Sequence, residues 1–258
     1  MNFKKTLITF VHYDCGNKQK VYRENLNFFQ KVGVIENENY HFNFVVNSET
    51  GIENIIPRKN VSAIQGHNKG HDFGAYKQSL ESVDINDYDY FIFINDTCRG
   101  PFIPDYIPSE ITWVEMFLDK LDETVKMVGA TWWTNTNGDA WTKKHFIKNA
   151  KHIQSYCFGV DKVGIEILQK HNKFNTIGKS RDEIIIEHEI GSSQILIENG
   201  YEIRSFQLSR RVETSHCSIN KLNLYFGNTI DALEVMFIKD NAINGIVKNY
   251  TKWILSKK

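Results

Sequence analysis

Short apolar runs alternate with amphipathic stretches along most of this chain. The apolar runs predict strands and the amphipathic stretches, with apolar residues at helical spacing, predict helices. The predicted strands cover residues 5–11, 41–47, 61–65, 88–94, 126–133 and 152–160, and the predicted helices cover residues 20–31, 73–82, 111–121, 161–171 and 189–197. This alternation favours an α/β fold with a central, mostly parallel sheet flanked by helices.

The strand at 88–94 is aromatic and β-branched without alternation, which is typical of a central strand covered on both faces. It ends in Asn95, Asp96 and Thr97, three oxygen-bearing side chains at the carboxyl end of the strand. Open α/β sheets bind ligands at that edge, and Mg²⁺ or Mn²⁺ prefers such oxygen ligands. The alternative is that Asn95 and Asp96 only cap a turn.

A glycine-containing polar turn precedes the helix at 73–82. Gly70 permits positive φ or a close backbone approach, and Lys69 together with the amides at the helix start would favour a phosphate. Asp72 stands just before the helix. The alternative is that Asn68, Lys69 and Gly70 form only a tight turn and that Asp72 is an N-cap.

Length and charge narrow the classes of function. The chain has 258 residues with 31 basic and 31 acidic side chains, so its formal net charge is zero. This balance gives no electrostatic footprint for nucleic acid, and any phosphate binding must be local. No linker or repeat divides the chain, which predicts a single domain over residues 1–258.

The cysteines and apolar segments favour a cytoplasmic protein without a transmembrane segment. The four cysteines are far apart and form no CxxC motif, which indicates reduced thiols and no structural zinc. No apolar segment approaches the roughly 18 residues of a membrane span. Residues 242–258 carry apolar side chains at helical spacing and lysines elsewhere. We expect this helix to pack on the domain, and peripheral membrane contact is the alternative.

Six motifs in order resemble a known family, the bacterial and algal-virus glycosyltransferases related to rhamnan synthesis protein F. They are NKGHDFGAYK at 68–77, FIFINDTCRGPF at 91–102, VGATWW at 128–133, HIQSYCFGVD at 152–161, EHEIGSSQILIENGY at 187–201 and EVMFIKD at 234–240. The resemblance implies a GT-A type fold. It also implies transfer of a sugar from a nucleotide-diphosphate donor to a hydroxyl of a glycan acceptor, in polysaccharide or surface-glycan biosynthesis.

The resemblance implies a donor site and a divalent metal, Mn²⁺ or Mg²⁺. Asp96 and His216 would hold the metal, although a lone histidine is more often structural or exposed. The donor would lie beside the loop after the first strand and beside the polar residues described above. The implied donor-binding residues are Val11, His12, Tyr13, Asn68, Lys69, Gly70, Asp72, Asn95 and Arg210. Arg210 suits a diphosphate because guanidinium groups bind phosphate well.

The same resemblance implies a catalytic acid at the first turn of a helix that ends at a glycine. Glu189 fits that position, with Gly200 after the helix, and Glu187 is the substitute because His188 stands where many relatives have an acid. We expect inversion, because a base is visible and a nucleophile is not. The alternative is a solvated acidic first turn that the helix dipole favours.

Trp132 and Trp133 lie near a predicted strand end, where aromatic faces could bind the acceptor sugar, or they could be ordinary core or rim residues. Two rival functions stay open. A sugar nucleotidyltransferase would carry a basic, glycine-rich loop after the first strand, whereas VHYDCGN at 11–17 has one glycine and no arginine. A non-catalytic glycan-binding or scaffold domain would keep the fold without binding a donor through a metal.

Overall fold

A seven-stranded sheet forms the centre of the protein. The computed structural model describes residues 4–14, 16–133, 143–145, 151–207, 231–240, 243 and 245–257. Across the sheet the strands are β10 (Glu202–Ser205), β6 (Val125–Gly129), β9 (Cys157–Asp161), β4 (Tyr90–Asn95), β1 (Thr6–His12), β2 (Tyr40–Val46) and β3 (Val61–Gln65). Neighbours are parallel except that β9 runs antiparallel to β4 and β6. The predicted α/β class with a mostly parallel central sheet is confirmed.

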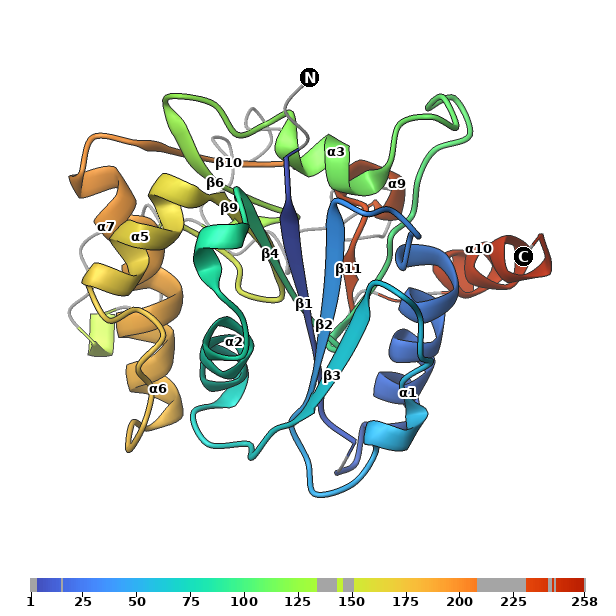
Figure 1. Cartoon of the computed structure of the whole chain (residues 1–258), viewed down its shortest axis with the longest axis horizontal. Coiled ribbons are helices and arrows are strands. Elements are labelled where there is room, and N and C mark those ends of the chain that lie inside the picture. Colours follow the sequence, from blue (N-terminus) through green and yellow to red (C-terminus); the bar gives the residue numbers. More distant parts are fainter. Residues whose placement is uncertain are drawn as a thin grey trace.

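Helices cover both faces of the sheet (Figure 1). One face carries α1 (Gln19–Phe28) and α3 (Trp113–Leu118), and the other carries α2 (His71–Glu81), α5 (Lys162–Lys170), α6 (Arg181–Ile184) and α7 (Gly191–Glu198). Alternate residues of β4 point to opposite faces, so Ile92 and Ile94 join the core beneath α1, whereas Phe91 and Phe93 join the core beneath α2. All four side chains are fully buried, as expected for a central strand.

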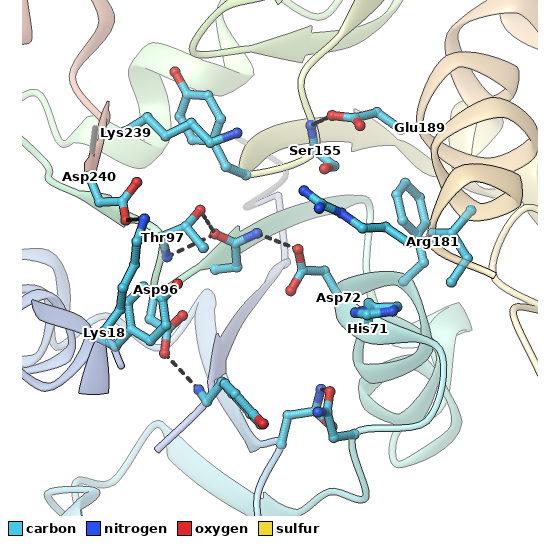
Figure 2. A pocket seen from close by; sticks show the side chains of 18 of the residues that line it. Lys18, His71, Asp72, Asp96, Thr97, Ser155, Arg181, Glu189, Lys239 and Asp240 are labelled. Atoms are coloured by element: carbon cyan, nitrogen blue, oxygen red, sulfur yellow. Dashed lines mark hydrogen bonds and ion pairs between the residues drawn. The ribbon is translucent and has the colours of Figure 1, made fainter. Parts of the chain in front are cut away.

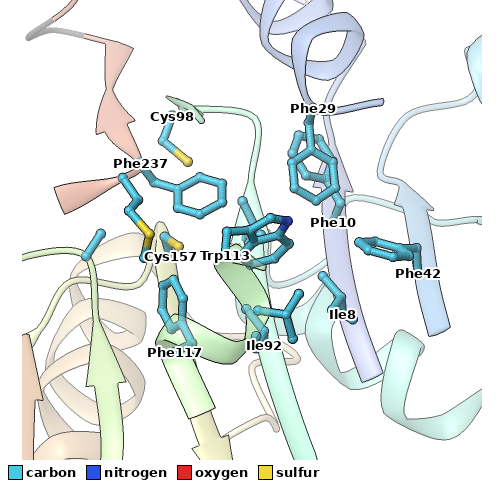
Figure 3. Close-up of a cluster of buried hydrophobic side chains, with 14 of the residues drawn as sticks. Ile8, Phe10, Phe29, Phe42, Ile92, Cys98, Trp113, Phe117, Cys157 and Phe237 are labelled. Carbon is cyan, nitrogen blue, oxygen red and sulfur yellow. The ribbon is translucent and has the colours of Figure 1, made fainter. Parts of the chain in front are cut away.

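The core beneath α1 and α3 is aromatic (Figure 3). Phe29 stacks on Phe10 with ring centroids 4.6 Å apart and meets Trp113 edge-on at 6.0 Å. Trp113 donates its indole N–H to the Gly33 carbonyl oxygen at 2.8 Å, so the one polar atom of this ring is satisfied inside the core. This packing fixes β1 and β4, whose carboxyl ends carry the polar residues singled out above.

Two predicted strands are each divided in the structure. The strand expected at 126–133 leaves the main sheet after Gly129, and its last residues form β7 (Trp132–Trp133), which pairs with β8 (His152–Ile153). The strand expected at 152–160 is divided into β8 and β9. A side chain at Gly129 would collide with Ile153, so the glycine lets this second strand pair cross close to the sheet.

The helix expected to begin at Glu189 begins instead at Arg181, and that part of the prediction is wrong. Ser180 and Glu183 form a capping box, which sets the helix start. The helical run continues through a π-helical segment (Ile185–Ile190) into α7, so Glu189 lies inside the run and not in its first turn.

The carboxyl-terminal helix α10 (Gly245–Ser256) packs beside α1. Phe28, Phe102 and Val247 form a small buried cluster, and the Tyr250 ring packs at a tilt against Phe102 with ring centroids 5.8 Å apart. Before α10, the short α9 (Ala232–Val235) leads into β11 (Ile238–Lys239). β11 pairs antiparallel with β5 (Cys98–Arg99), the segment that follows β4.

Close packing at the start of α2 predicts the effect of a small substitution. A Cβ atom at Gly74 would collide with the Lys69 carbonyl oxygen. Gly74→Ala should therefore lower the free energy of unfolding by about 1–3 kcal/mol, although alanine is the better helix former. Gly245→Ala is the control, because nothing lies within 4 Å of its added methyl group. Denaturant unfolding of both variants measures the difference, and equal stabilities would contradict this packing.

Candidate functional site

A cavity of about 500 Å³ lies at the carboxyl ends of β1 and β4. Figure 2 shows the side chains that line it. They come from the loop after β1 and the start of α1, the ends of β2 and β4, and the turn and first residues of α2. The connection between β8 and β9, the helical run from α6 to α7, and β11 supply the others. Tyr13, Asn68, Asp72, Asn95, Asp96 and Glu189, all predicted from sequence, are among the lining residues.

Asp96 is held rigidly at the base of the cavity. Its Oδ2 atom accepts a hydrogen bond from the Tyr13 backbone N–H at 2.6 Å and lies 2.8 Å from His12 Nδ1. His12 is fully buried and does not itself line the cavity, so it acts behind Asp96. Burial raises the pKa of Asp96, and the hydrogen bond with His12 partly offsets that rise.

Asn95 connects Asp72 to the end of β4. Its amide nitrogen donates to Asp72 Oδ2 at 2.7 Å, while its Oδ1 atom accepts from the Thr97 backbone N–H at 3.0 Å and hydroxyl at 2.5 Å. These bonds fix the orientation of the amide. Burial, followed by the charge of Asp96, raises the pKa of Asp72 to about 7.

The raised pKa of Asp72 predicts how stability depends on pH. Between its unfolded value near 3.8 and its folded value of about 7, the folded state holds a proton that the unfolded state has released, so stability falls as pH rises through this window. Asp72→Asn should therefore stabilise the protein by at least about 1 kcal/mol at pH 8 and change little at pH 4. Urea unfolding in EDTA at both pH values measures this, and an equal effect at the two would contradict it.

Asp240 is a second carboxylate beside Asp96 that the sequence analysis did not assign. β11 pairs with β5, and the Asp240 backbone N–H then donates to the Thr97 carbonyl oxygen at 2.7 Å. The Asp240 carboxylate binds Lys18 Nζ at 2.6 Å, and its charge contributes to the raised pKa of Asp96. The motif EVMFIKD ends in this residue, but only the long-range pairing of β11 places it here.

Glu189 and Glu187 lie on different sides of the helical run. Glu189 lines the cavity, and its Oε1 atom accepts a hydrogen bond from the Ser155 backbone N–H at 2.8 Å (Figure 2). Glu187 does not line the cavity and pairs on the outer surface with Lys179. The geometry therefore distinguishes the two candidate acids.

Three cationic side chains that the sequence analysis did not assign also line the cavity. Lys18 comes from the loop before α1, Arg181 from the first residue of α6, and Lys239 from β11. In Figure 2 Arg181 reaches toward the centre of the cavity, between Asp72 and Ser155. Lys18, Arg181 and Lys239 together offer the positive charge that a diphosphate requires.

Several predicted residues do not line this cavity. Val11 is buried in the core, Lys69 is exposed, and Gly70 caps α2 with φ of +86°, where a side chain would collide with Thr176. Trp132 and Trp133 are half-buried in β7. Arg210 and His216 lie outside the described residues.

The side chains at Asp96 have the chemistry of ligands for a divalent cation. Within the described ranges, no group of three or more His, Cys, Asp or Glu side chains is arranged to hold a metal ion by itself. Asp96 and Asp240 nevertheless place two carboxylates near one another, and their mutual repulsion is part of what raises the pKa of Asp96. A divalent ion would relieve that repulsion, and carboxylates plus phosphate oxygens are its usual ligands.

Comparison with protein families identifies the class of this protein. The family model for rhamnan synthesis protein F matches residues 44–256, most of the chain, and the match includes every lining residue except Tyr13, Lys18 and Tyr22. The chain belongs to the rhamnan synthesis protein F family, which indicates a role in polysaccharide synthesis. A search of curated proteins found no match. Among the helices of the described segments, none has the length and apolar character that crossing a bilayer requires.

Proposed function

We propose that this protein is a glycosyltransferase with a GT-A type fold, which moves a sugar from a nucleotide-diphosphate donor to a hydroxyl of a glycan acceptor. The family supports the broad role in polysaccharide synthesis. The observation that carries the specific proposal is the juxtaposition of Asp96 and Asp240 with Lys18, Lys239 and Arg181 in one cavity. Carboxylates for a cation and cations for a diphosphate are the two halves of a nucleotide-sugar site.

The chain's own residues would hold the departing diphosphate and the acceptor. A bound Mn²⁺ or Mg²⁺ would supply Lewis-acid stabilisation of the developing negative charge. Asp96, held by His12 and Tyr13, and Asp240, fixed by β11, would hold this ion. Lys239 and Arg181 would add positive charge that is already in place before the reaction, so that little reorganisation is needed.

Glu189 would take the proton from the attacking acceptor hydroxyl. Its carboxylate lines the same cavity, and the Ser155 N–H holds one of its oxygens. Glu189 supplies a base, and no side chain is assigned as a nucleophile. This combination favours direct displacement with inversion at the sugar carbon. Asn68, Tyr13 and Asn95 would then serve the donor, whereas Lys69 would need to swing inward from the surface to reach it.

A screen of nucleotide-sugar hydrolysis tests this proposal without knowledge of the acceptor. The protein is incubated with a panel of uridine, guanosine and thymidine diphosphate sugars in Mn²⁺, and release of the nucleoside diphosphate is measured. We expect slow hydrolysis of one donor class, because water can replace the acceptor. Formation of a nucleotide sugar and pyrophosphate from a sugar 1-phosphate and a nucleoside triphosphate instead would indicate a sugar nucleotidyltransferase, and no donor binding at all would indicate a glycan-binding scaffold.

A further inference from the structure

One ion pair in the candidate site joins two residues that are 222 positions apart. Lys18 Nζ, at the start of α1, lies 2.6 Å from Asp240 Oδ2, which follows β11. Both residues line the cavity of about 500 Å³. In Figure 2 the Lys18 side chain extends to Asp240 on the side of the cavity where Asp96 lies. The lysine therefore binds one of the two carboxylates that would hold the divalent ion.

The two partners of this ion pair differ in their freedom to move. The Asp240 backbone N–H donates to the Thr97 carbonyl oxygen at 2.7 Å, and the Asp240 side chain is 8% exposed, so the carboxylate is fixed. The Lys18 side chain is 57% exposed, and its ammonium ends a flexible four-carbon stem. The hydrogen bond with Asp240 raises the pKa of Lys18, which keeps the side chain cationic at neutral pH. Lys18 is thus the partner that can be displaced.

Lys18 and a divalent ion would compete for the same carboxylate. Among the cations that line the cavity within the described ranges, only Lys18 pairs with a carboxylate of the lining. A divalent ion between Asp96 and Asp240 would repel the ammonium from Asp240, because two positive charges would share one anionic partner. The displaced ammonium would stay at the cavity, where a diphosphate offers it new oxygen acceptors.

We propose that Lys18 exchanges Asp240 for the donor diphosphate and so couples the binding of the metal to the binding of the nucleotide. When no diphosphate is bound, Lys18 opposes the metal at Asp240. When the diphosphate binds, the same ammonium bonds to phosphate oxygens and leaves the carboxylate to the metal. The two ligands therefore bind better together than separately, and the effect is reciprocal. This inference rests on the proposed function, which makes the metal and the diphosphate ligands of this cavity.

Lys18→Met tests the exchange, because methionine keeps much of the length of the side chain and removes its charge. Mn²⁺ binding without nucleotide is measured by electron paramagnetic resonance of the free ion. We expect Lys18→Met to bind Mn²⁺ about threefold or more tightly than the wild type, because Asp240 has lost its competing cation. Uridine, guanosine and thymidine diphosphates are then titrated in saturating Mn²⁺. The nucleotide that binds should bind about tenfold more weakly to Lys18→Met, because a charge-assisted hydrogen bond is lost.

Two further variants separate this exchange from a structural role of Lys18. Lys77→Met breaks the ion pair between Lys77 and Glu81, 3.6 Å apart and outside this cavity, and should leave both affinities unchanged. In an Asp240→Asn background, Lys18→Met should no longer tighten Mn²⁺ binding, because the carboxylate for which the two cations compete is gone. A disturbed fold in Lys18→Met would instead weaken the binding of both ligands.

The inference alone would be overturned if the wild type binds a nucleotide in Mn²⁺ but Lys18→Met binds Mn²⁺ no more tightly than the wild type. An unchanged nucleotide affinity in Lys18→Met, or tightened Mn²⁺ binding that persists in the Asp240→Asn background, would also overturn it. If the wild type binds none of the three nucleotides in Mn²⁺, the proposed function is contradicted and the inference with it.

Discussion

Asp96→Asn is expected to lower sugar transfer by about 10³-fold or more, because a divalent ion contributes several kcal/mol to stabilising transition-state charge. Metal-dependent donor binding should be lost with it. Asparagine keeps the volume of the side chain, and its Oδ1 atom can still accept the hydrogen bond from Tyr13, so the fold should persist. What disappears is the negative charge that would hold the cation. Calorimetric titration of the donor in Mn²⁺, together with circular dichroism, measures both properties.

Asp161→Asn provides the matched control for this carboxylate-to-amide change. Asp161 pairs with Lys126 at 2.7 Å and caps α5, and it does not line the donor cavity. Asparagine is also a good N-cap, so this variant should keep its activity. If Asp96→Asn keeps full metal-dependent donor binding, Asp96 does not hold the metal.

Glu189→Gln is expected to lower kcat by about 10²–10⁴-fold, the usual contribution of a general base, with little change in donor affinity. Glutamine can still accept the hydrogen bond from the Ser155 N–H, so the side chain should stay in place without its ability to take a proton. The comparison of kcat with the donor dissociation constant separates loss of a base from loss of a binding residue.

Glu187→Gln is the control on the same helical run. Glu187 pairs with Lys179 at the surface, and 48% of its side chain is exposed, so its loss should cost little activity. An inactive Glu187→Gln beside a nearly wild-type Glu189→Gln would reverse the two roles. Activity in both variants would mean that neither residue is the base, and the inverting mechanism would lose its main support.

Local patterns in the sequence predicted the parts of the fold that depend on local interactions. The unbroken apolar run at 88–94 predicted the central strand, and β4 lies at the centre of the sheet. Asp72 and Asn95 were both expected beside the donor, and Asn95 does bind Asp72. The start of the α6 to α7 run was wrongly predicted at Glu189, although Ser180 and Glu183 have capping-box spacing.

Long-range pairings account for most of what the sequence could not predict. Asp240 reaches the site because the two-residue strands β5 and β11 pair across about 140 positions, and strands this short carry no periodicity. The separation of Trp132 and Trp133 from the cavity has a similar origin, because β7 is a two-residue strand paired with β8. Lys18 and Arg181 flank helix starts, and their approach to the cavity depends on how those helices pack.

Titration of uridine, guanosine and thymidine diphosphates into the wild-type protein, once in Mn²⁺ and once in EDTA, tests the central claim most directly. The account predicts that one nucleotide binds in Mn²⁺ and that EDTA weakens this binding at least about tenfold, because the diphosphate would lose the cation joining it to Asp96. Equal affinity in Mn²⁺ and EDTA, or no binding of any of the three nucleotides, would contradict a metal-dependent nucleotide-sugar site in this cavity.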